Sequence, residues 1–98
     1  MLSDIKRCFV CGTTKDLHVH HIFEGVANRK KSEEDGMKIY LCGYHHNLSS
    51  AGIHFNKELE LKVKKIAQEA WMRQFVPNLS REDQIEAFIK RYGRNYLD

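Results

Sequence analysis

The chain lacks any long apolar run. No stretch approaches the roughly 20 apolar residues that a membrane-spanning helix needs, so we expect no membrane-spanning helix and no membrane partner. Residues 1–7 also lack the apolar core of a secretion signal, and we expect a cytoplasmic protein. Internal repeats and long linkers are missing from the sequence as well. The 98 residues are therefore expected to form one domain, residues 1–98.

Cysteine is scarce and odd in number. Three cysteines cannot all pair within the chain, and a Cys-x-x-Cys pair in a chain without a secretion signal favours metal binding over a disulfide. The remaining composition, 42% hydrophobic and 30% charged, is that of an ordinary soluble fold. The formal net charge of +3 suits a polyanionic partner without establishing one.

The first half of the chain, to about residue 55, shows little helical periodicity. Residues 17–23 have the β-branched, alternating character of a strand, and residues 37–42 alternate likewise, so the two are predicted to pair. The polar residues 24–36 between them are interpreted as a long hairpin connection. A short helix is expected from about Tyr44 to about Gly52.

The second half, residues 56–98, is predicted to form two helices. Asn56 is a good N-cap for the first helix, which Pro77 ends. Its apolar residues recur at three- and four-residue spacing, as on one buried face: Leu59, Val63, Ile66, Ala67, Ala70, Trp71 and Phe75. Ser80 begins the second helix and Gly93 ends it. The second apolar stripe comprises Ile85, Phe88, Ile89 and Tyr92.

All the cysteines and histidines lie between Cys8 and His54, and four of them form two pairs with two residues between ligands. These four are Cys8, Cys11, Cys42 and His45. This spacing lets two knuckles reach one tetrahedral zinc ion, which would act as a structural cofactor. His46 is an alternative fourth ligand, but only His45 keeps the two-residue spacing.

Four of the other five histidines form a second set, interleaved with the first: His20, His21, His46 and His54. The order is Cys-x-x-Cys, then Val-His-His-Ile, then Leu-Cys-x-x-His-His. This order resembles that of the HNH endonucleases, whose ββα-metal (His-Me finger) fold is shared by phage junction-resolving nucleases and colicin DNases. The resemblance covers about residues 8–55.

The resemblance implies an α+β fold, with a small ββα-metal core and zinc knuckles over residues 8–55, followed by the two C-terminal helices. It makes His20 and His46 ligands of a catalytic divalent ion, Mg²⁺, Mn²⁺ or similar, and His21 the general base. His54 would be a further ligand, with Asn47 as its competitor. It implies no small-molecule cofactor and a phage- or prophage-encoded protein.

The chemistry of phosphodiester cleavage agrees with these roles, because it needs a base for water and a cation near the leaving oxygen. Neighbouring residues of a regular strand point to opposite faces. His20 and His21 can therefore act at one site only if the strand ends or kinks there, or if one side chain reaches around. His18, on the same strand, is expected to be exposed or to support the site from behind.

The sequence departs from the family pattern at the middle asparagine, which braces the metal loop. Met37 stands at the corresponding position, five residues before Cys42. Asn28 or Asp35 could supply the brace instead. The fourth zinc ligand is also histidine rather than the commoner cysteine.

DNA is the expected partner. Arg29, Lys30 and Lys31 in the hairpin connection are the candidate phosphate contacts. A second basic group at the C-terminus contains Arg91 and Arg94. For any single one of these residues, a solvated surface position is the alternative.

The leading hypothesis is therefore a metal-dependent DNA endonuclease. A non-catalytic, zinc-binding nucleic-acid module is the alternative, and a protein-interaction zinc domain that uses the helical half is a third. The sequence does not predict an oligomeric state or a preferred DNA structure.

Overall fold

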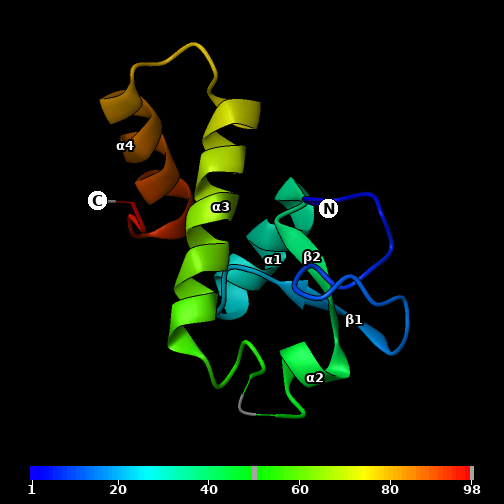
Figure 1. Cartoon of the computed structure of the whole chain (residues 1–98). Helices are drawn as coiled ribbons and strands as arrows, with labels where there is room; N and C mark the ends of the chain where they lie inside the picture. Colours follow the sequence, from blue (N-terminus) through cyan, green and yellow to red (C-terminus); the bar gives the residue numbers. More distant parts are fainter. Residues whose placement is uncertain (50, 98) are drawn as a thin grey trace.

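The protein has an α+β fold in a computed structural model that describes residues 1–49 and 51–97 (Figure 1). Its elements, in chain order, are β1 (Leu17–His21), α1 (Val26–Asp35), β2 (Lys38–Cys42), α2 (Gly43–His46), α3 (Lys57–Phe75) and α4 (Arg81–Tyr92). The predicted α+β class and the two C-terminal helices are confirmed. No helix of the described residues has both the length and the apolar character needed to cross a membrane.

The two predicted strands pair antiparallel, as expected, with His18 opposite Leu41 and His20 opposite Ile39. Pairing continues one step beyond the strands, where the Ile22 N–H donates to the Met37 carbonyl at 3.0 Å. Along β2 the buried side chains Ile39 and Leu41 alternate with half-buried ones, so one face of the hairpin packs on the core.

The prediction of a hairpin connection over residues 24–36 misses a helix, α1. Most of its residues favour helix, and the chain leaves it at Gly36 in the left-handed conformation, with φ 72°. The helix lacks an apolar stripe, and the residue that it buries is Ser32. The Ser32 hydroxyl accepts from the Phe23 N–H at 3.1 Å and donates to the Phe23 carbonyl at 3.2 Å. Polar contacts therefore anchor α1, and apolar periodicity gave no signal for it.

The short helix expected from Tyr44 to Gly52 is shorter than predicted. α2 ends at His46, and the chain then turns back, with the Gly52 N–H donating to the Ser49 carbonyl at 2.9 Å. Ser50, within the expected helix, lies outside the described residues.

The caps of α3 and α4 confirm the sequence prediction. The Asn56 side chain accepts from the Leu59 N–H at 3.1 Å, and Ser80 accepts from Asp83 at 3.2 Å. The buried face of α3 is partly different from the predicted stripe and comprises Val63, Ala67, Gln68, Trp71 and Met72. Ile66 and Phe75 of the predicted stripe are instead about two-fifths exposed.

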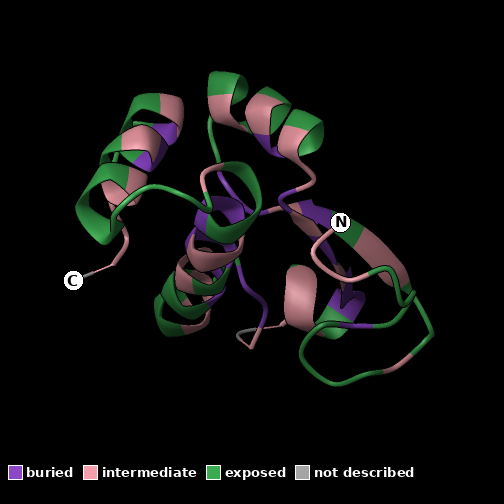
Figure 2. Cartoon of the chain, turned by 90° about the horizontal axis from the view of Figure 1, so that it is seen from above, coloured by how far each residue is buried: buried purple, intermediate pink, exposed green. Residues whose placement is uncertain are grey.

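One core joins the hairpin to the helices. Buried residues lie on β2, α3 and α4 (Figure 2), and the apolar ones belong to a single cluster. Its members include Ile22, Phe23, Ile39, Leu41, Ile53, Val63, Met72 and Phe88. The two halves of the chain therefore share one hydrophobic core.

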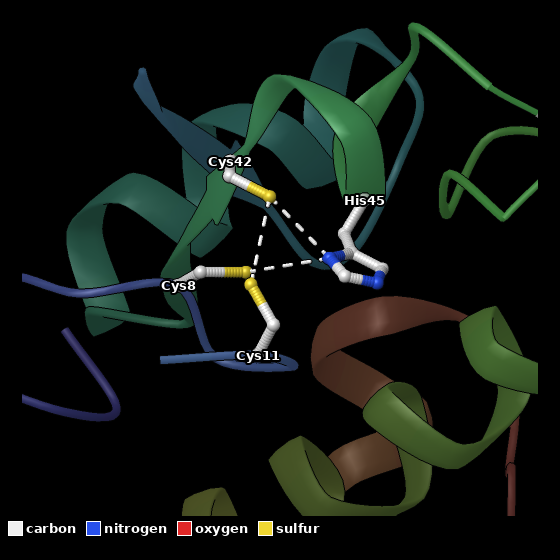
Figure 3. A group of neighbouring side chains, drawn as sticks. All are labelled: Cys8, Cys11, Cys42 and His45. Atoms are coloured by element: carbon white, nitrogen blue, oxygen red, sulfur yellow. Dashed lines mark hydrogen bonds between the residues drawn. The ribbon is translucent and has the colours of Figure 1, made fainter. Parts of the chain in front are cut away.

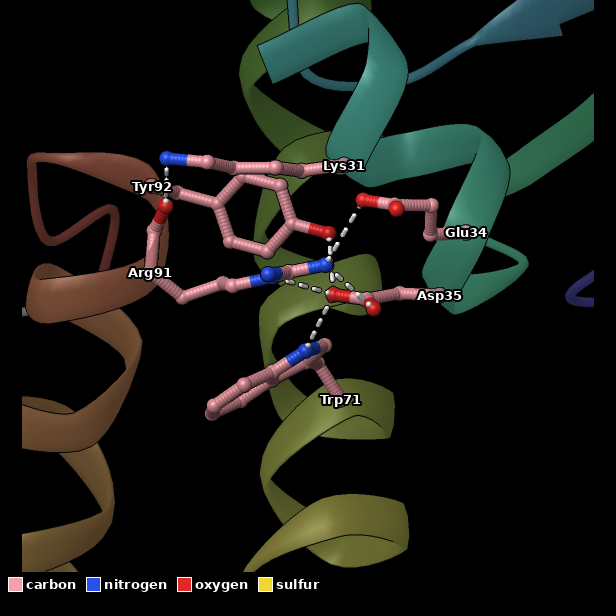
Figure 4. Close-up of polar contacts among 6 residues, drawn as sticks. All are labelled: Lys31, Glu34, Asp35, Trp71, Arg91 and Tyr92. Atoms are coloured by element: carbon pink, nitrogen blue, oxygen red, sulfur yellow. Dashed lines mark hydrogen bonds and ion pairs between the residues drawn. The ribbon is translucent and has the colours of Figure 1, made fainter. Parts of the chain in front are cut away.

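Asp35 ties the end of α1 to α3 and α4 (Figure 4). Its carboxylate accepts from Trp71 Nε1 at 2.8 Å, from Arg91 Nε at 3.0 Å and from the Tyr92 hydroxyl at 2.7 Å. Burial alone would raise the pKa of this carboxyl, but the hydrogen bonds from Arg91, Tyr92 and Trp71 outweigh it and lower the pKa.

Two side chains of α1 also cap the C-terminus of α4. Asn28 donates to the Tyr92 carbonyl at 3.1 Å, and Lys31 donates to the Arg91 carbonyl at 2.8 Å. Asn28 and Asp35 therefore hold α1 against α4, and the suggestion that either one braces the histidine loop is wrong.

Candidate functional site: two clusters of metal-ligand side chains

The four predicted zinc ligands meet at one point between the N-terminal loop, the end of β2 and α2 (Figure 3). Their ligand atoms all lie within 4.8 Å of one another, close enough to hold a metal ion such as zinc. Cys8 and Cys11 come from the loop, which is fixed to β2 because the Phe9 N–H donates to the Tyr40 carbonyl at 2.8 Å. Cys42 ends β2 and His45 follows on α2.

The distances fit tetrahedral coordination. Cys11 Sγ and Cys42 Sγ are 3.8 Å apart, and His45 Nδ1 lies 3.3 Å from Cys42 Sγ and 3.9 Å from Cys8 Sγ. Bonds of about 2.3 Å to sulfur and about 2.0 Å to nitrogen would separate such ligand atoms by about 3.5–3.8 Å. His45 rather than His46 joins the cysteines, as the spacing predicted.

The local backbone favours a thiolate at Cys8. Burial alone would raise the pKa of the Cys8 thiol, but hydrogen bonds from the backbone at Cys11, Cys42 and Val10 lower it to about 6. Burial raises the pKa of Cys42 instead. A bound cation would offset the unfavourable burial of a thiolate at Cys42, because a thiol that coordinates a metal ion is deprotonated.

A second cluster contains His20, His46 and His54, whose ligand nitrogens also lie within 4.8 Å of one another. His46 Nε2 and His54 Nε2 are 3.1 Å apart. The His20 ring centre lies 5.5 Å from that of His46 and 5.3 Å from that of His54. The structure thus brings together three histidines from β1, α2 and the loop before α3.

His20 is only 4% exposed. Burial, with smaller contributions from His46 and His54, lowers the pKa of its imidazole to about 3. Burial likewise lowers the pKa of His46. The neutral imidazole is the form that binds a metal ion, so this environment keeps nitrogen lone pairs available.

Backbone hydrogen bonds hold the loop that carries His54. The Ile53 N–H donates to the His45 carbonyl at 2.8 Å, and the His54 N–H donates to the His46 carbonyl at 3.4 Å. The loop is therefore fastened to α2 by its own backbone.

A cavity of about 430 Å³ opens onto the three-histidine cluster. Its lining includes all three histidines of the cluster, together with His21, Glu24, Val26 and Arg29. β1 ends at His21, so the two neighbouring histidines can serve one cavity from different directions. His20 packs into the cluster, whereas His21 Nε2 lies 2.9 Å from Glu33 Oε2 on α1. The same oxygen of Glu33 accepts from Lys38 at 2.8 Å.

His18 contacts the cluster from the side, as expected of a supporting residue. Its Nδ1 lies 2.9 Å from His46 Nδ1, and its Nε2 lies 3.2 Å from Asp16 Oδ1. Asp16 and Glu33 were not predicted as site residues. Asp16 stands two positions before His18, but neither carboxylate carries a motif, and Glu33 reaches His21 only because α1 folds back along β1.

The structure separates the other predicted residues. Asn47 is exposed and does not line the cavity, whereas its competitor His54 does. Arg29 lines the cavity, Lys30 is exposed, and Lys31 is engaged in capping α4. At the C-terminus, Arg91 pairs with Asp35 and Glu34.

No family model, curated protein or solved structure matches this chain. Function must therefore be inferred from the geometry and the donor chemistry of the two clusters.

Proposed function

We propose that the protein is a metal-dependent endonuclease of the HNH type, which hydrolyses phosphodiester bonds in DNA. The observation that carries this proposal is a single cavity lined by three clustered histidines and by His21, which is itself oriented by Glu33. In this interpretation the hairpin and α2 form the ββα-metal unit. α1 is then an insertion between its strands.

The donor set indicates which ions would suit the second cluster. Three neutral imidazoles fit a borderline transition ion such as Co²⁺, Ni²⁺ or Zn²⁺ better than Mg²⁺, which prefers oxygen ligands. Mn²⁺, the other ion considered from sequence, is also a hard ion that prefers oxygen, so it suits this cluster less well than Co²⁺, Ni²⁺ or Zn²⁺. A divalent ion held there would offset the negative charge that develops on the leaving oxygen.

His21 is the proposed general base. If its Nε2–H donates to Glu33, Nδ1 carries the lone pair and can take a proton from water. Hydrogen bonds from Lys38 and His21 lower the pKa of Glu33, which therefore stays a carboxylate. A carboxylate at this position also stabilises the imidazolium that forms as the water loses its proton.

Arg29 is the proposed phosphate contact. Arg29 lines the same cavity, and a guanidinium group matches a phosphate with two parallel N–H donors. Lys30, exposed on the next position of α1, remains a proposed backbone contact. Lys31 is the least suited of the three, because its ammonium is already bound to the Arg91 carbonyl.

The test is cleavage of plasmid, branched and single-stranded DNA by the zinc-loaded protein with each of these ions in turn. We expect nicking or cleavage that is strongest with a transition ion. His21→Ala should lower the rate by about 100-fold or more, because a general base contributes about that factor. Zinc content and circular dichroism should stay unchanged. Lys62→Ala, which alters an exposed position of α3, is the control and should cleave normally.

DNA left intact under all these conditions would contradict the proposal. Salt-sensitive DNA binding with one bound metal ion per chain and no cleavage would favour the non-catalytic module instead. Cleavage that survives His21→Ala would exclude His21 as the base.

A further inference from the structure

Asp16, His18 and His46 form a continuous chain of hydrogen-bonding groups that ends at the three-histidine cluster. Asp16 Oδ1 lies 3.2 Å from His18 Nε2, and His18 Nδ1 lies 2.9 Å from His46 Nδ1. The other nitrogen of His46, Nε2, lies 3.1 Å from His54 Nε2. Every polar atom of the two intervening rings therefore has a neighbour.

Along this series of hydrogen bonds, each group determines which nitrogen of the next ring carries the proton. A carboxylate can only accept, so the neutral ring of His18 must carry its proton on Nε2 and present a lone pair at Nδ1. His46 must then donate from its own Nδ1 to that lone pair. A neutral imidazole has one proton, so His46 is left with a lone pair on Nε2, the nitrogen that faces His54.

We infer that Asp16 and His18 are positioning residues, which select the tautomer and orientation of His46 so that Nε2 is its free ligand atom. The inference rests on the proposed function in that it concerns the same three-histidine cluster. The chemical class of ligand is a divalent transition ion. Partners of this kind behind a metal-binding histidine typically change metal affinity by about 10- to 100-fold.

The backbone around Asp16 supports this role. Asp16 has a left-handed conformation, with φ 51°, which aspartate and asparagine tolerate better than most residues. Its carbonyl accepts from the Gly43 N–H at 3.0 Å. A Cβ at Gly43 would collide with Asp16 Oδ2, so glycine leaves the space that the carboxylate occupies. Gly43 lies between the zinc ligands Cys42 and His45, so the zinc knuckle itself places Asp16.

The variants can separate hydrogen bonding from general structure. His18→Ala removes the acceptor, whereas His18→Asn keeps an acceptor atom at the position of Nδ1. Asp16→Gly removes the carboxylate without straining the left-handed backbone, and Asp16→Asn retains an acceptor oxygen. Asp4→Asn removes the same charge from an exposed position elsewhere in the N-terminal half and is the matched control.

Two measurements apply to each variant. Long-range ¹H–¹⁵N spectra of the histidine rings, recorded with zinc bound to the cysteine cluster alone, report which nitrogen of His46 is protonated. Titration with Co²⁺ or Mn²⁺ reports affinity at the second cluster. We expect His46 to be protonated on Nδ1 in the unmodified protein and in the Asn variants. In His18→Ala this preference should be lost and affinity should fall by about 10- to 100-fold, with a smaller loss in Asp16→Gly.

The inference would be overturned if His46 were protonated on Nε2 in the unmodified protein, or if the Asn variants lost as much affinity as His18→Ala and Asp16→Gly. The spectra need neither cleavage nor an ion in the second cluster. A protein that shows the expected tautomer but never cleaves DNA would therefore contradict the proposed function and leave this inference supported.

Discussion

In each of two pairs of adjacent histidines, the two side chains lie in different surroundings. His45 and His46 lie on α2, where successive residues point about 100° apart, so one joins the cysteines and the other joins the histidine cluster. His20 and His21 separate because β1 ends at His21 and α1 supplies a partner for it. If the sequence were shifted by one position at either pair, a histidine would stand in the surroundings that its neighbour now occupies.

Asp35 carries the largest polar network among the described residues. Its side chain is 10% exposed and accepts hydrogen bonds from Trp71, Arg91 and Tyr92. Burial, the hydrogen bond to Asp35 and its negative charge together raise the pKa of Tyr92, so this hydroxyl remains a donor. Removing the charge of Asp35 would leave the buried donors without a carboxylate.

We expect Asp35→Asn to lower the free energy of unfolding by about 2–3 kcal/mol at neutral pH. The pKa of Asp35 is lower in the folded protein than in the unfolded chain, so its contribution is complete above the unfolded value of about 3.9. The contribution is lost as the pH falls through the lower, folded pKa. Urea unfolding of both proteins as a function of pH would measure the difference.

Acid would also protonate the cysteines of the proposed zinc site and release a bound ion, so only the difference between the two proteins reports on Asp35. Glu34→Gln is the matched control, because Glu34 meets Arg91 at 3.3 Å from a side chain that is 54% exposed. It should change stability by less than about 0.5 kcal/mol. A gap between Asp35→Asn and the unmodified protein that stays constant down to the lowest pH would contradict the assignment.

Among the elements, the loop between α2 and α3 packs closely against backbone atoms at Gly52. Gly52 is buried there, and a Cβ on it would lie 2.8 Å from the His46 carbonyl oxygen and 3.0 Å from the Ser49 carbonyl oxygen. These neighbours are backbone atoms, which cannot swing aside. The loop in this form places His54 beside His46.

Gly52→Ala should therefore shift the loop, cost about 1–3 kcal/mol of stability and weaken transition-ion binding at the histidine cluster. Zinc at the cysteine cluster should remain. Asn47→Ala is the control, since Asn47 lies outside the cavity and its loss should change neither quantity. Metal titration followed by thermal unfolding gives both readouts. Weaker binding in Asn47→Ala would restore this residue as a ligand candidate.

Elements with local signals could be predicted from the sequence. Asn56 and Ser80 act as caps through atoms three residues away, so the starts of α3 and α4 follow from short segments. α1 could not be predicted in the same way, because it is anchored by Ser32 and by polar contacts with α4. The buried face of α3 includes Gln68 because Tyr96 and Asn95 bond its amide from the C-terminus.

The same distinction applies to the candidate site. The spacing of Cys8, Cys11, Cys42 and His45 is itself the geometric requirement of a zinc knuckle, so their convergence into one cluster could be predicted. Asp16 and Glu33 could not be predicted as site residues. Asp16 contacts His18 because of a turn and Glu33 contacts His21 because of a helix, and no residue pattern indicates either contact. The position of Arg29 in the cavity, and the loss of Lys31 to a helix cap, likewise depend on where α1 packs.

At the scale of the whole molecule, both clusters depend on the segment where β2 ends and α2 begins. The N-terminal loop brings Cys8 and Cys11 to the cysteine cluster and is hydrogen-bonded to β2, and α2 begins directly after Cys42. The histidine cluster is not needed in the same way to hold segments of the chain together, because β1, α2 and backbone hydrogen bonds already place its members. The dependence between the clusters is therefore expected to be unequal.

Cys11→Ser and His54→Ala should reveal this inequality. Each removes one exposed ligand, from the cysteine cluster and the histidine cluster respectively. Cys11→Ser should lower Tm by more than about 10 °C, because zinc binding contributes folding free energy, and it should also weaken ion binding at the histidine cluster. His54→Ala should weaken that binding alone, with zinc content and Tm nearly unchanged. Thermal unfolding and metal titration of both variants test this. Full affinity at the histidine cluster in Cys11→Ser would show that the histidine cluster forms without an intact cysteine cluster.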